Sequence, residues 1–186
     1  MDGGRSWRDA SSGIPDDGVG ALAIDPRRPA TVYAGTFDNG VFKSTNGGRS
    51  WRAMNAGMGP RWAELAFDKR AVSALAIDPQ GPATIYAGTD LGVFKTTDGG
   101  RGWRAVNAGL ANADASALAI DPRTPATVYT VTGAGVFRSI DGGGTWRPFS
   151  RGLARLYVTG LAIASTGRVL YAGTRGGGVF DYSFPG

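Results

Sequence analysis

Three stretches of this chain carry nearly the same eight residues: Ser44–Trp51 (STNGGRSW), Thr96–Trp103 (TTDGGRGW) and Ser139–Trp146 (SIDGGGTW). Each stretch begins with a hydroxyl side chain, continues with Asn or Asp two residues later and then glycine, and ends on tryptophan. A short acceptor side chain such as that of Asp98 or Asp141 can bind backbone N–H groups ahead of it, and glycine accepts positive φ. The pattern predicts a tight turn that is followed by an aromatic anchor.

A longer repeat surrounds these stretches. Leu22–Pro26 (LAIDP) recurs as Leu75–Pro79 and Leu118–Pro122, and Leu161–Ile163 keeps its first three residues. The isoleucines at 24, 77, 120 and 163 lie 53, 43 and 43 residues apart, so the unit has about 43 residues and one copy carries an insertion. Each unit has four short apolar or β-branched runs separated by turn residues. Such a unit predicts a four-stranded blade of a β-propeller.

The eight-residue stretches resemble the Asp-box, or bacterial neuraminidase repeat, of sialidase- and sortilin-like propellers, in which the Asp is here replaced once by Asn46. A fourth copy is split, because Asp2–Trp7 begins in mid-box and Gly178–Ser183 stops where a box should start. We therefore expect an all-β propeller of four four-stranded blades, in which the N-terminal strand completes the last blade. The resemblance implies a structural role for the box residues, namely Asp2, Trp7, Asn46, Trp51, Asp98, Trp103, Asp141 and Trp146.

The expected organisation is a single propeller domain over residues 1–186. The blade units are expected at about 18–57, 71–109, 115–152 and 158–183, with the N-terminal strand at 2–10. The chain contains 31 glycines and 10 prolines, a content that is typical of a chain with many tight turns.

Composition restricts the chemistry. The chain has no cysteine and no histidine, which excludes disulfides, histidine-based metal sites and Ser-His-Asp systems. The resemblance to sialidases implies three arginines, a Tyr nucleophile with a Glu partner and an Asp acid/base. However, Tyr33, Tyr86, Tyr129 and Tyr171 occupy equivalent repeat positions, as packing residues do, and Glu64 is the sole glutamate. We therefore expect no enzyme activity, no cofactor and no metal, and a binding or scaffold function.

A ligand site, where one exists, is expected at the axial mouth. The turn between the second and third strand of each unit differs from blade to blade, and the insertion near residues 59–67 has no counterpart in the other units. Two alternatives remain: a carbohydrate-active module, either lectin or glycoside hydrolase, and a fragment or engineered piece of a larger propeller. The candidate ligand-binding residues are Asp38, Asn39, Arg61, Trp62, Glu64, Asp90 and Arg175.

Partners are constrained only in part. The net charge is +5, but arginines dispersed over repeated turns are typical of a solvated face, so a nucleic-acid partner is not expected. No apolar run is long enough to span a membrane, and no leader pattern is visible at the N-terminus. A glycan or a protein remains a possible partner, and the compartment is undetermined. The split box is satisfied by a four-bladed monomer, which we prefer, or by an eight-bladed homodimer.

Overall fold

The computed structural model describes residues 6–15, 18–58, 71–153 and 156–184, and within them every regular element is a strand. Three sheets have four strands each, in the orders β1-β2-β3-β4, β5-β6-β7-β8 and β9-β10-β11-β12, and the last sheet has three, β13-β14-β15. The strands are β1 Val19–Ile24, β2 Val32–Thr36, β3 Val41–Ser44, β4 Arg52–Ala53, β5 Val72–Ile77, β6 Ile85–Thr89, β7 Gly92–Thr96, β8 Arg104–Ala105, β9 Ala117–Ile120, β10 Val128–Thr132, β11 Gly135–Ser139, β12 Arg147–Pro148, β13 Tyr157–Ile163, β14 Val169–Arg175 and β15 Gly178–Ser183.

All neighbouring strands are antiparallel and follow one another directly in sequence. We number the four sheets as blades 1 to 4 in chain order. The second strands of blades 2 and 3, β6 and β10, are buried along their whole length. Side chains alternate between the two faces of a strand, so complete burial requires that both faces of these sheets are covered. The apolar and threonine-rich runs therefore reflect blades packed face to face.

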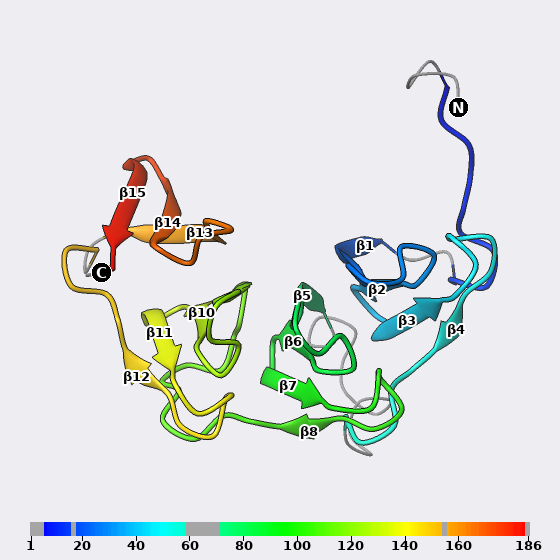
Figure 1. The fold of residues 1–186 in the computed structure, drawn as a ribbon, viewed down its shortest axis with the longest axis horizontal. Coiled ribbons are helices and arrows are strands. Elements are labelled where there is room, and N and C mark those ends of the chain that lie inside the picture. The colour runs from blue at the N-terminus through cyan, green and yellow to red at the C-terminus, as the bar shows by residue number, and fades with distance from the viewer. Residues whose placement is uncertain (1–5, 16–17, 59–70, 154–155, 185–186) are drawn as a thin grey trace.

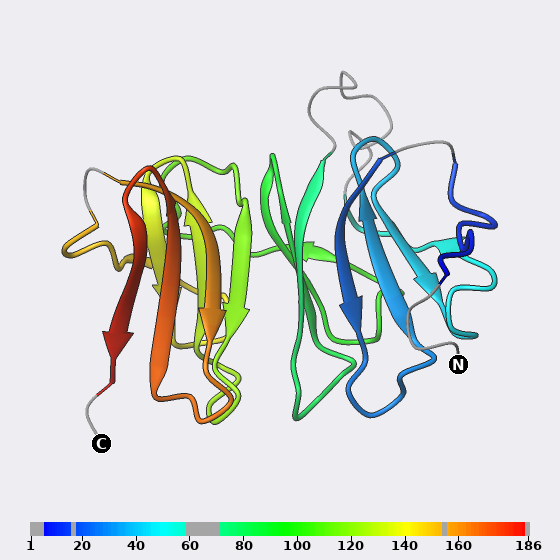
Figure 2. The same ribbon diagram turned by 90° about the horizontal axis from the view of Figure 1, so that it is seen from above.

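The four blades follow one another along an open arc (Figure 1). The first strands β1, β5, β9 and β13 contact one another in sequence along its inner side. The turns from second to third strand lie on one face of the arc, uppermost in Figure 2, and the turns from first to second strand lie on the opposite face. We call the first the upper face and the second the lower face. No helix in these residues is long and apolar enough to cross a bilayer. The all-β fold of four blades is as expected.

Hydrophobic clusters fill the spaces between blades. The cluster between blades 1 and 2 joins Tyr33 and Val41 to Ile85, Phe94 and Trp103. The cluster between blades 2 and 3 repeats this arrangement and contains the buried tryptophan of the third box, Trp146. Burial of apolar surface between successive sheets is the main stabilising contribution to such a stack.

The expected ring closure within one chain is not seen. Blade 4 has three strands instead of four, Trp7 is fully exposed, and the described N-terminal residues form no strand. Instead, the segment lies against blade 1: Ser12 O accepts a hydrogen bond from Trp51 N at 2.9 Å. Blades 1 and 4 are at opposite ends of the arc (Figure 1), so a segment held on blade 1 does not reach blade 4. Residues 2–5 of the predicted strand lie outside the described residues.

Candidate functional site

The second-to-third-strand turns are built by a repeated threonine and glycine. Thr36 Oγ1 donates to Gly40 O at 3.1 Å, and Thr89 Oγ1 donates to Gly92 O at 2.9 Å. Both glycines have positive φ, 77° and 106°, a conformation that L side chains rarely adopt. These hydrogen bonds fix the backbone of each turn, so a side chain placed on the turn projects from a rigid support.

The structure brings four predicted candidates, which belong to three blades, to the upper face of the arc. Asp38 and Asn39 are half-buried in the β2–β3 turn, Asp90 is half-buried in the β6–β7 turn, and Arg175 is exposed at the end of β14. Asp90 Oδ2 accepts a hydrogen bond from Ala71 N at 3.2 Å, which joins the turn to the residue before β5 of the same blade. The other three candidates, Arg61, Trp62 and Glu64, lie outside the described residues.

Two asparagines that the sequence reasoning did not single out hold these turns in place. Asn55 Oδ1 accepts from Val41 N at 2.8 Å and its Nδ2 donates to Asn39 O at 2.8 Å. Asn107 makes the same pair of bonds to Val93 N and Leu91 O in blade 2. Both asparagines stand four residues after a box tryptophan, and this repeated spacing was the signal available in the sequence.

The box turns lie on the lower face of the arc. Their carboxylate oxygens accept hydrogen bonds from groups within the same turn. Asp98 Oδ1 accepts from the Thr96 hydroxyl at 2.7 Å and from Gly102 N at 3.0 Å. In the third box, Asp141 accepts from Ser139, from Thr145 N and from the Thr145 hydroxyl. These carboxylates accept hydrogen bonds from groups within their own turns.

Acid titration of the third box gives a test of this role. The Thr145 N–H, the Ser139 hydroxyl and the Thr145 hydroxyl lower the pKa of Asp141 from 3.8 to about 2. Because the folded-state pKa lies below the unfolded one, the contribution of Asp141 to stability is complete above pH 3.8 and is lost as pH falls toward 2. We expect Asp141→Asn to remove this acid dependence, which urea unfolding at a series of pH values measures.

The first box supplies the matched control. Asn46 keeps the backbone contact through Oδ1, which accepts from Ser50 N at 3.0 Å, while its Nδ2 donates to Ser50 Oγ. The converse change Asn46→Asp should therefore add acid dependence where Asp141→Asn removes it. Identical pH profiles for the parent and both variants would contradict the assignment.

A hollow of about 530 Å³ lies between blades 1 and 2 on the lower face, beside the second box turn. Within it, Tyr33 OH and Lys43 Nζ both donate to Gly99 O, at 3.1 and 3.0 Å. Burial raises the pKa of Tyr33 to about 12 and lowers that of Lys43, the latter with help from the nearby Arg52. Tyr86 and Lys95 repeat the arrangement on Gly142. The repeated Tyr and Lys contacts therefore belong to blade packing and do not distinguish a functional site.

The inner side of the arc forms an apolar groove of about 450 Å³. Its wall is made by the first strands of all four blades, through residues such as Ile24, Ile77, Ile120 and Ile163. Titratable side chains are absent from the described wall, so proton transfer at this groove would depend on groups at its ends. Its lining residues lie where the first strands end, beside the first-to-second-strand turns, whereas Asp38 and Asp90 lie on second-to-third-strand turns at the opposite face.

The comparisons with known proteins agree with this architecture. The structure matches the Niastella koreensis GH74 enzyme with a TM-score of 0.69 and 22% identity, over 89% of this chain and 28% of that one. The computationally designed Ika4 protein matches with a TM-score of 0.65 and 16% identity, over 97% of this chain and 100% of that one. The chain has a β-propeller fold. No family model matches, so the Asp-box resemblance remains one of motif.

A sequence match adds a functional direction. The propeller is 29% identical over 87 residues to a probable oligoxyloglucan-reducing end-specific xyloglucanase of Neosartorya fischeri, which covers 46% of this chain and 10% of that protein. The chain thus spans a small part of the length of this relative. The expectation of a non-enzymatic module is wrong in the light of this match, because it points to a glycoside hydrolase.

Proposed function

We propose that this propeller is part of a carbohydrate-active protein that binds and hydrolyses a β-linked polysaccharide of the xyloglucan type. The observation that carries the proposal is the 87-residue similarity to a xyloglucanase, supported by the fold shared with a GH74 enzyme. The coverage of 10% and 28% of those chains also favours a second candidate, in which this unit is one portion of a larger propeller protein.

The axial mouth is the proposed substrate site. Glycoside hydrolysis generally requires two carboxyl groups on either side of the scissile bond, one as acid and the other as base or nucleophile. The half-buried Asp38 and Asp90 lie on turns of adjacent blades at this mouth, and Asp90 Oδ2 accepts a hydrogen bond from Ala71 N. Asn39 and Arg175 add polar groups suited to sugar hydroxyls.

Release of reducing ends from xyloglucan and its oligosaccharides tests the proposal, together with calorimetric titration of the same sugars. We expect Asp38→Asn and Asp90→Asn each to lower kcat by about 100-fold or more, the usual loss when a general acid or base is removed. Asparagine keeps an acceptor for Ala71 N, so the turn that carries residue 90 should remain folded.

Asp78→Asn is the matched control at the opposite end of blade 2. Asp78 Oδ1 accepts from Gln80 N at 2.8 Å and from Gly81 N at 3.1 Å, and asparagine preserves both contacts. Its kcat should equal that of the parent chain. Parent activity in both mouth variants would reject the two carboxylates, and absence of both binding and turnover in the parent would reject the substrate class.

A further inference from the structure

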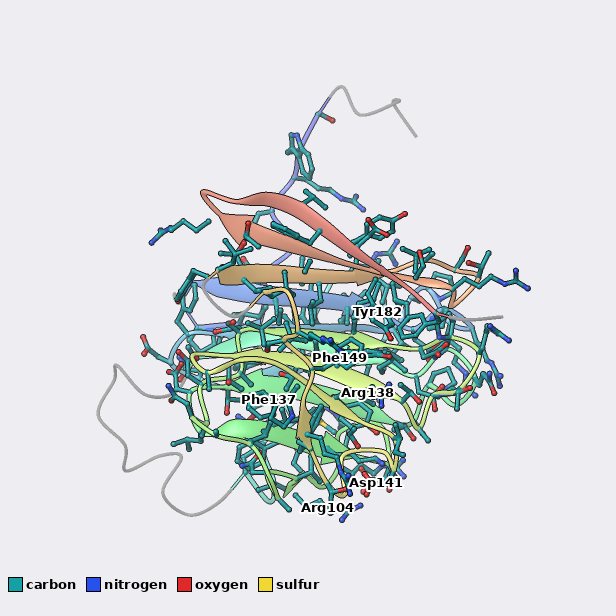
Figure 3. All side chains as sticks on the ribbon, turned by 90° about the vertical axis from the view of Figure 1, so that its left-hand side faces the viewer. Arg104, Phe137, Arg138, Asp141, Phe149 and Tyr182 are labelled. Atoms are coloured by element: carbon teal, nitrogen blue, oxygen red, sulfur yellow. The ribbon has the colours of Figure 1, made fainter. Side chains whose placement is uncertain are left out.

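Blade 4 carries a hollow where the other blades carry a tryptophan. The hollow measures about 170 Å³ and is largely apolar, with Phe149, Gly152, Leu170, Phe180 and Tyr182 in its wall. Phe149 and Tyr182 meet edge to face, with ring centroids 4.9 Å apart, on the side of the molecule shown in Figure 3. The hollow lies beside β15, which in the described residues pairs with β14 alone.

The inner blades show what fills the equivalent position. Trp103 N donates to Ala56 O at 2.8 Å, and its indole Nε1 donates to Met54 O at 2.7 Å. Trp146 repeats both bonds, to Ala108 O and to Val106 O. Each tryptophan thus packs against the segment that follows the last strand of the preceding blade and binds two of its carbonyl oxygens. We call this position the seat of the tryptophan. A Cβ at Gly57 in that segment would collide with Trp103 O.

The same spacing after blade 3 selects Phe149 O and Arg151 O as the acceptors for a further tryptophan. Gly152 corresponds to Gly57 and has a similar φ, 89° against 84°, yet a Cβ built there has nothing within 4 Å. Blade 4 therefore presents the seat for a box tryptophan without the tryptophan itself.

Trp7 has the sequence position and the exposure to fill this seat. It stands six residues before Gly13, as Trp51 stands six residues before Gly57. Ala10 O accepts from Trp51 Nε1 at 2.7 Å and Ser12 O accepts from Trp51 N, as Met54 and Ala56 do for Trp103. The N-terminal segment thus leads onto blade 1 in the way that each blade leads onto the next, and it carries a fully exposed tryptophan.

The outer faces of blades 1 and 4 are complementary at two further positions. The hydroxyls of Tyr33 and Tyr86 bind a box glycine of the next blade, whereas the equivalent Tyr171 is 43% exposed against 1% for Tyr86. The corresponding box glycine, Gly47 of blade 1, has nothing within 4 Å of a built Cβ. Both partners of this repeated contact are therefore present in the chain, on its two end blades.

Valine and glycine form the second complementary pair. Val72 is fully buried, and a Cβ built at Gly35 of blade 1 would lie 2.8 Å from its Cβ. The equivalent residues on the end blades are Val19, which is 44% exposed, and Gly173, which has nothing within 4 Å. Valine and glycine at these positions reproduce the close approach of the inner blades.

In the open arc, the described residues do not supply these contacts to one another. Blades 1 and 4 lie at its two ends (Figure 1), so Trp7 held beside blade 1 is remote from the seat in blade 4 of its own chain. A second copy turned about a two-fold axis offers blade 1 to blade 4 at both junctions at once, which covers the outward faces of both end blades. We propose that two copies close one eight-bladed ring, in which Trp7 of each copy fills the hollow beside Phe149 and Tyr182 of the other.

Sedimentation of the 186-residue chain gives the first test. The expected particle has twice the chain mass of 19.2 kDa. Trp7→Ala should raise the dimer Kd by about 30-fold or more, as loss of an interface tryptophan at a central contact does. A particle of one chain mass at tens of micromolar protein would overturn the proposal, as would a particle of three or more chains.

Disulfide trapping distinguishes the two-copy ring from closure within a chain. The parent has no cysteine, so Val19→Cys and Gly173→Cys variants can be refolded together and oxidised. A covalent product of twice the chain mass, formed in the mixture and absent from either variant alone, supports the proposal. The matched control, Gly35→Cys with Val72→Cys in one chain, should yield a disulfide within that chain without joining two chains. No product in the mixture while the control forms its disulfide would overturn it.

Discussion

Replacement of Trp103 by alanine is expected to lower the free energy of unfolding by about 3–5 kcal/mol, the usual range for removing a large buried aromatic side chain. Trp103 is buried between blades 1 and 2 in the cluster that contains Tyr33, Met58 and Phe94. Its indole Nε1 also donates to Met54 O at 2.7 Å. The variant therefore leaves a cavity and also removes the partner of a carbonyl oxygen. Chemical denaturation of the two proteins measures the difference.

Ile140→Ala provides the comparison within a box. Ile140 is a large apolar residue of the third box but is 67% exposed, so its truncation should change the stability by less than about 0.5 kcal/mol. A similar loss in both variants would mean that the tryptophan contributes no more than a surface residue. The box would then not anchor one blade to the next.

The second large effect is expected for Gly57→Ala. Gly57 has φ of 84°, and a Cβ at this position would collide with the backbone carbonyl of Trp103. Positive φ costs an L residue roughly 1–2 kcal/mol, and overpacking adds about 1–3 kcal/mol. Because the obstacle is backbone, the segment between blades 1 and 2 must move to relieve the collision. We expect a total loss of about 2–5 kcal/mol by equilibrium unfolding.

Gly176→Ala separates these two contributions. Gly176 has nearly the same φ, 85°, but a Cβ there has nothing within 4 Å. It should therefore show the conformational cost alone, about 1–2 kcal/mol. If the two alanine variants lost the same amount, the close approach between residue 57 and Trp103 would have no energetic consequence.

The candidate site could be predicted only in part. The differences among the second-to-third-strand turns pointed to four residues, Asp38, Asn39, Asp90 and Arg175. The structure places all four on the upper face of the arc. Their position on one face follows from the repeat, because equivalent turns of stacked blades lie on the same face. Enzyme activity was judged wrongly from the sequence, since the absence of a sialidase-like Tyr and Glu set says nothing about hydrolysis that uses a different set of carboxylates. The similarity to a xyloglucanase supplied the correction.

By itself, the sequence determined the local structure of this protein: the fourfold repeat, its short strands and the box turns. These features depend on contacts among residues close together in the chain, such as Asp98 with Gly102. Only the tertiary structure decided that blades 1 and 4 lie apart. The rotation from one blade to the next depends on how side chains such as Tyr33 and Trp103 pack between sheets, and small rotations accumulate along the stack. For that reason the split box was visible in the sequence, whereas the open arc and the exposed Trp7 were not.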